Sequence, residues 1–153
     1  MLILIVILGI FIAGLLTPYF YDKHKMIVAS LQSLLVLSVI VFFAFYVGSV
    51  THGQTFNPSY PWLPSLNIQL SFYLDGLSLF FGLLITVIGL LVLLYSFKYM
   101  EHYPKQGRFF GYLLFFMGSM LGVVLSANLI SLFVFWELTS FSSFLLIGFN
   151  NEK

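Results

Sequence analysis

The sequence predicts an all-α integral membrane protein with five transmembrane helices and a short β-hairpin or strand in the outer loop between helices 2 and 3. Three observations support this prediction. Of the 153 residues, 61% are hydrophobic and 7% charged, with a mean hydropathy of +1.07, far from the values of soluble domains. Five nearly uncharged runs of about 18–25 residues are each long enough to span a bilayer. One connecting segment alternates apolar and polar residues. Residues 1–153 are therefore predicted to form a single membrane domain.

The first two helices are predicted at about residues 1–20 and 26–50. The first run lacks the basic region and the cleavage site of a signal peptide, so it is expected to be retained. Pro18 and the charged cluster at 22–25 are expected to end it. The second run is interrupted only by Gln32 and by small hydroxyls that can bond to their own helix backbone.

The segment between helices 2 and 3 changes character. Residues 51–64 contain three prolines and predict an extramembrane loop. Residues 66–74 alternate with a period of two, which predicts a half-buried strand on the membrane domain. Asp75 follows directly and is the expected N-cap of helix 3, with an external ion entrance as the less favoured reading.

The last three helices are predicted at about residues 77–97, 109–126 and 129–149. The fourth carries small residues that predict close helix contacts: Gly111, Gly118, Ser119 and Gly122. Only two residues separate the fourth helix from the fifth, so these two are expected to be antiparallel neighbours.

Glu137 is the residue most in need of explanation. It lies near the middle of the fifth predicted helix, where a carboxylate costs about 2.5–3.5 kcal/mol on insertion scales. The functional interpretation is a proton carrier in a dry environment, whose pKa is raised by desolvation and tuned by a basic partner. The alternative is a structural carboxylate that fixes helix packing through hydrogen bonds.

Several hydroxyl-bearing residues follow Glu137 in the sequence. Thr139, Ser140 and Ser143 supply hydroxyls within two turns and are the expected supporting groups, although hydroxyls also serve helix packing. Trp136 is expected to pack between helices. No Lys, Arg or His of the chain lies at the depth of Glu137, so its partner is expected from another segment or subunit.

Several functional classes are excluded or disfavoured. The absence of cysteine removes disulfides and thiolate-ligated iron–sulfur clusters. The six basic residues are dispersed and form no face for nucleic acid. The three histidines lie in separate polar segments without metal-ligand spacing, and no phosphate-binding or hydrolase motif occurs, so we expect no metal, no cofactor and no enzyme active site.

The basic residues predict an orientation. All six follow the first, third or fifth helix: Lys23, Lys25, Lys98, Lys105, Arg108 and Lys153. By the positive-inside rule, the amino terminus and the strand-bearing loop face outside, and the carboxy terminus of this chain is cytoplasmic.

Three stretches resemble a known family: YPWLPSLNIQLSFYLDGLSLFF, LYSFKYM and FFGYLLFFMGSMLGVVLSANLISLFVFWELTSFSSFLLIGF. They look like the amino-terminal portion of the A-subunit of the Mrp-type multisubunit Na+/H+ antiporter, which is itself similar to chain 5 of respiratory complex I. The resemblance covers about residues 60–150. Residues 1–55 match in hydropathy alone.

The resemblance implies a multi-pass antiporter subunit of the bacterial cell membrane, with a β-hairpin in its outer loop. It implies that Glu137 moves protons by pairing with a lysine on a later, seventh helix of the same subunit. It also implies other antiporter subunits as partners, with H+ and Na+ as the transported ions. The chain departs from the family in ending after the fifth helix, before that lysine, and in having Ala127 where the family commonly has an acid.

Three hypotheses of function follow. The first is a proton-translocating subunit of a multisubunit monovalent cation/proton antiporter. The second is a membrane-arm subunit of complex I or of a membrane-bound hydrogenase, with the redox chemistry in partner chains. The third, motivated by the missing lysine, is a truncated scaffold that conducts nothing.

Overall fold

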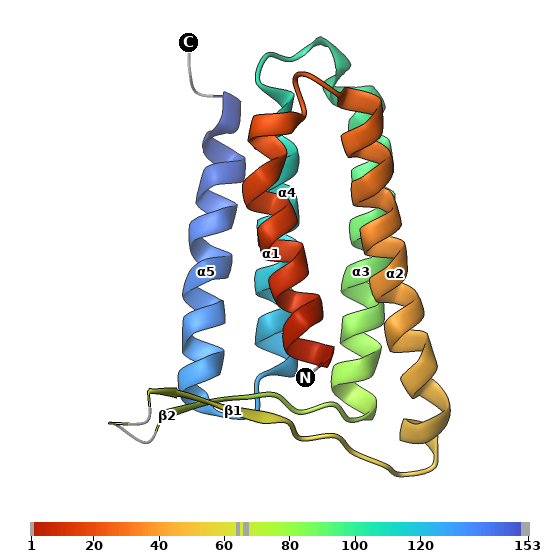
Figure 1. Ribbon diagram of the computed structural model, residues 1–153, viewed down its shortest axis with the longest axis vertical. Helices are drawn as coiled ribbons and strands as arrows, with labels where there is room; N and C mark the ends of the chain where they lie inside the picture. The colour runs from red at the N-terminus through yellow and green to blue at the C-terminus, as the bar shows by residue number, and fades with distance from the viewer. Residues whose placement is uncertain (1, 64, 66–67, 151–153) are drawn as a thin grey trace.

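The computed structural model describes residues 2–63, 65 and 68–150, and this part of the chain forms a bundle of five long helices capped at one end by a small sheet (Figure 1). The helices are α1 (Leu2–Phe20), α2 (Lys25–Thr51), α3 (Gly76–Tyr99), α4 (Gln106–Leu125) and α5 (Leu129–Ile147). All five are long and apolar enough to cross a membrane. Successive helices run in opposite directions, so the predicted fold class and the antiparallel α4–α5 pair are confirmed.

α1 ends at Phe20, as the predicted bounds of about 1–20 have it and just before the charged cluster, but Pro18 is not what ends it. The helix includes Pro18 and continues to Phe20. Proline lacks the N–H that would bond to the carbonyl of Gly14 one turn earlier. This carbonyl lies against α4, where a Cβ on Gly111 would come within 2.6 Å of its oxygen. A neighbouring helix that packs this closely makes an interior proline tolerable in a membrane helix.

The segment between α2 and α3 folds into an antiparallel hairpin of β1 (Ser59–Leu63) and β2 (Ile68–Ser71). The resemblance implied this hairpin, but the alternation at 66–74 did not place it correctly. β1 lies inside the segment expected to be loop, and β2 is shorter than expected; residues 66 and 67 lie outside the described part. Pro61 is tolerated because both strands of a two-stranded sheet are edges.

Beyond β2 the chain pairs on two sides: Leu74 exchanges backbone hydrogen bonds with Phe56, in the segment before β1, and residues 71–73 pair with the junction of α4 and α5. The backbone N–H of Tyr73 donates to the carbonyl of Leu125 (2.7 Å), and that of Ala127 donates to Ser71 (2.9 Å). Phe72 and Leu74 are fully buried and Tyr73 is exposed, so the alternation predicted the inward side chains correctly there. The hairpin is thus fastened to the end of the bundle from which α5 starts.

α4 is the central helix, packed against α1 on one side and α5 on the other. Its small residues give the predicted close contacts. A Cβ on Gly118 would come within 3.2 Å of Ile10, and one on Gly122 would overlap the ring of Phe135. The prediction of a close-packing glycine face on this helix is confirmed.

Two polar features lie away from this packing. Gln32 of α2 donates its side-chain N–H to the hydroxyl of Thr17 of α1 (2.6 Å), and both residues are 3% exposed. At the end of the bundle opposite the hairpin, Lys98 forms an exposed ion pair with Glu101 (3.4 Å). The links that carry the other described basic residues lie at this same end, whereas Lys153 is outside the described residues (Figure 1).

Candidate functional site

Local sequence determines where Glu137 lies along α5. Asn128 is the N-cap of the helix, because its side-chain oxygen accepts the backbone N–H of Ser131 (2.7 Å). The side-chain amide of Asn128 also donates to the carbonyl of Gln69 in β2 (2.7 Å). This residue, which the sequence interpretation treated only as part of a link, therefore fixes both the start of α5 and its connection to the hairpin. Glu137 is the ninth residue of the 19-residue helix, close to its middle.

Phe135 is the buried aromatic residue of α5. Its ring lies 6.4 Å from that of Phe11 in α1 and 6.1 Å from that of Phe72 beyond the hairpin. Glu137 follows two residues later, which places it about 200° around the helix from Phe135. Packing Phe135 inward therefore directs Glu137 away from α4.

Glu137 lies on what we call the outer face of α5, formed by Phe133, Trp136, Glu137, Ser140 and Phe144, all of which are exposed. Within the described residues Glu137 has no hydrogen bond and no ion pair. The described chain does not provide the dry environment expected for this acid, because a helix at the edge of a bundle buries only the side that faces its neighbour. A partner for Glu137 must come from outside these residues.

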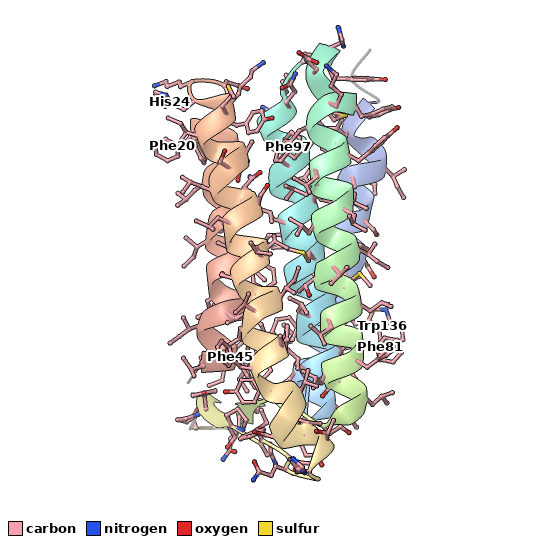
Figure 2. The ribbon with its side chains drawn as sticks, turned by 90° about the vertical axis from the view of Figure 1, so that its right-hand side faces the viewer. Phe20, His24, Phe45, Phe81, Phe97 and Trp136 are labelled. Carbon is pink, nitrogen blue, oxygen red and sulfur yellow. The ribbon has the colours of Figure 1, made fainter. Side chains whose placement is uncertain are left out.

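Trp136 does not pack between helices, and that expectation is wrong. Its side chain is 60% exposed and projects from the edge of the bundle (Figure 2). It shares the outer face with the acid, so the carboxylate is surrounded by aromatic surface.

Most hydroxyl groups near Glu137 donate hydrogen bonds to backbone carbonyls of α5 itself. Thr139 donates to the carbonyl of Phe135 (2.9 Å), and Ser143 donates to that of Ser140 (2.8 Å). Ser142 is fully buried and donates to Leu138 (2.8 Å). Ser140, exposed one turn beyond Glu137, is the hydroxyl on the same face as the acid.

Asp75 lies at the other candidate position, the start of α3. Its carboxylate accepts the backbone N–H of Ser78 (2.8 Å), and the Ser78 hydroxyl accepts the backbone N–H of Asp75 (2.8 Å). This reciprocal pair is a capping box. The Ser78 N–H and the burial of the site act in opposite directions, and the hydrogen bond prevails, so the pKa of the Asp75 carboxyl lies below its usual range.

The described residues offer little else for chemistry. Among them, no three His, Asp or Glu side chains gather in a way that could hold a metal ion. The site that remains is a single carboxylate at mid-helix on an aromatic outer face, which could gain or lose a proton but lacks a partner in this part of the chain.

This chain is similar to a complex I family and to curated Na(+)/H(+) antiporter subunits. Residues 62–110 match the family described as NADH-Ubiquinone oxidoreductase (complex I), chain 5 N-terminus. The chain is 51% identical over 115 residues to Na(+)/H(+) antiporter subunit A1 of Staphylococcus haemolyticus. It is 46% identical over 148 residues to the Na(+)/H(+) antiporter A-subunit of Alkalihalophilus pseudofirmus. These matches cover 75% and 94% of the chain but only 14% and 18% of the relatives, so the chain spans less than a fifth of their length.

Two solved structures share the fold. In the structure of the Mrp complex from Dietzia sp., a chain matches with a TM-score of 0.84 and 26% identity, over 96% of this chain and 16% of that one. The membrane-bound sulfane sulfur reductase, an archaeal respiratory membrane complex, matches with a TM-score of 0.78 and 21% identity, over 94% of this chain and 22% of that one. The second likeness concerns the fold alone.

Proposed function

This multi-pass membrane chain resembles the amino-terminal portion of the A-subunit of the Mrp-type Na+/H+ antiporters, and from this premise we propose that it is a proton-translocating part of a multisubunit monovalent cation/proton antiporter. The observation that carries the proposal is the carboxylate of Glu137 at the middle of α5. The chain takes part in transport and has no enzymatic activity of its own.

The cost of placing this carboxylate supports a functional role. A charged acid facing hydrocarbon costs about 2.5–3.5 kcal/mol, and the described residues offset none of that cost with an ion pair. A cationic side chain opposite the outer face of α5 would offset it. We propose that this partner is a lysine of the longer subunit, and that other antiporter subunits complete the assembly.

The proton step follows from this arrangement. We propose that Glu137 releases its proton when the lysine approaches and takes one up when the lysine withdraws. Alternation between the two states carries a proton, and we propose that Ser140, exposed one turn away on the same face, passes it on. Thr139 and Ser143 support the helix geometry through their backbone bonds.

The decisive experiment is Glu137→Gln in the assembled antiporter, measured as Na+-driven proton exchange in membrane vesicles. The amide keeps the shape and removes the titratable group, so coupled exchange is expected to be abolished while assembly persists. Glu101→Gln is the matched control, since Glu101 is exposed near the basic end of the bundle, and it should retain exchange. Full exchange by the Glu137 variant would refute the proposal.

A second candidate is a proton-pumping membrane-arm subunit of a redox complex. The match of residues 62–110 to the complex I chain 5 family is the observation that favours it. Purification of the chain from its native membrane separates the two: small membrane subunits as partners support the antiporter, and flavin or iron–sulfur subunits support the redox complex.

A further inference from the structure

A groove separates α1 from α5 at the end of the bundle where the basic links lie, and α4 forms its floor. It consists of two adjoining hollows of about 470 and 360 Å³, which share Arg108, Tyr112 and Leu145 as lining residues. The first hollow extends toward the middle of the bundle as far as Phe115 and Phe141, and the second extends toward Lys105.

The packing of α1 explains why the groove is open at one end and closed at the other. Near mid-bundle the ring of Phe11 meets that of Phe115 edge to face (4.7 Å between centroids) and stacks on that of Phe135 (6.4 Å). These contacts join α1, α4 and α5. Closer to the basic end, Gly14 and Gly111 form part of the lining, and their close contact brings α1 onto α4 so that the floor of the groove is closed there.

The lining changes chemically along the groove. Lys105 and Arg108 lie at the outer end, where the links between helices reach the membrane boundary, and the inner end is apolar and aromatic. From Arg108 to Phe115 the floor runs about 10 Å along α4. A cationic mouth that leads into an apolar slot is complementary to a molecule with an anionic head and a hydrocarbon tail. Basic pockets between transmembrane helices bind the head groups of anionic lipids in this way.

We propose that this groove is a binding site for an anionic phospholipid, with its phosphate at Lys105 and Arg108 and one acyl chain between α1 and α5. The five N–H donors of an arginine match the geometry of phosphate oxygens. Charge at the mouth favours a lipid over an apolar protein segment as the occupant. The groove borders the outer face of α5, since Phe144 lines its second hollow, but its charged mouth is formed by Lys105 and Arg108 and not by Glu137, so the proposal does not depend on the antiport proposal.

Tryptophan fluorescence in vesicles tests the proposal on the full chain. Phe141→Trp serves as the reporter in the groove, in a background with Trp62→Phe and Trp136→Phe. Leu91→Trp, on the exposed side of α3, is the matched control. Each is reconstituted with brominated phosphatidylglycerol or brominated phosphatidylcholine at equal mole fraction, because bromine quenches tryptophan on contact.

The groove reporter is expected to be quenched preferentially by the anionic lipid, with an enrichment of roughly fivefold for each basic residue engaged. Replacing Lys105→Gln and Arg108→Gln together should equalise the two lipids, while circular dichroism shows unchanged helix content. The control reporter should not discriminate. Equal quenching by both lipids in the unsubstituted groove, a preference that survives the double replacement, or no quenching by either lipid because protein fills the groove would each overturn the proposal.

Discussion

Two residues of α5 show how a short separation in sequence produces opposite environments. Phe135 is 6% exposed and packs into the glycine face of α4, whereas Glu137 lies on the exposed side of the same turn. The helix rotation of 100° per residue accounts for the difference. The position of the acid is thus a consequence of where the ring of Phe135 finds space.

Asp75, the N-cap of α3, predicts that the stability of the chain depends on pH in the acidic range. Its pKa is lowered in the folded chain by the N–H of Ser78. The ionised Asp75 carboxylate therefore adds to the free energy of unfolding in full above its unfolded pKa of 3.8. This contribution is lost as the pH falls through the lower pKa of the folded chain. Thermal unfolding of the detergent-solubilised chain between about pH 5 and pH 2 should show this loss, and Asp75→Asn, which keeps a capping oxygen, should reduce it.

A matched control for that measurement is Asp22→Asn, which removes an exposed carboxylate from the α1–α2 link, where His24 is the N-cap of α2. In this variant, the stability lost at acidic pH should be as large as in the unsubstituted chain. An Asp75→Asn variant with an undiminished loss would contradict the assignment to this cap.

At the scale of the elements, the contact between α4 and α5 depends on the absence of a side chain at Gly122. A Cβ there would overlap the ring of Phe135, so Gly122→Ala should move the two helices apart or force the ring out of its place. Overpacking of this kind costs about 1–3 kcal/mol. Thermal unfolding in detergent should show a lowered melting temperature.

Gly9→Ala is the control for that prediction, because a Cβ at Gly9 of α1 would meet nothing within 4 Å. It should be neutral or slightly stabilising, since alanine restricts the unfolded chain more than glycine does. Equal effects of the two substitutions would show that the glycine face of α4 does not determine helix packing.

At the scale of the whole molecule, charge distinguishes the two ends. The described basic residues gather around the α1–α2 and α3–α4 links, and the hairpin covers the opposite end (Figure 1). We propose that the basic end is cytoplasmic and that the amino terminus and the hairpin face outside.

The chain contains no cysteine, so single cysteines can report this orientation directly. Gln54→Cys, in the exposed segment before β1, should react with a membrane-impermeant maleimide in intact cells. Lys23→Cys, in the link between α1 and α2, should react only after permeabilisation. The reverse pattern would show that the orientation is inverted.

The sequence by itself determined the five helices, their order, the capped start of α3 and the resemblance to the antiporter A-subunits, which the relatives confirm. These follow from local properties: run length, caps and characteristic strings. Only the tertiary structure decided that 59–63 is a strand and that Trp136 faces outward. In a membrane chain the sides of a helix that face protein and lipid are both apolar, so hydropathy does not show which side packs. Close fit between surfaces, such as Phe135 against Gly122, makes that choice.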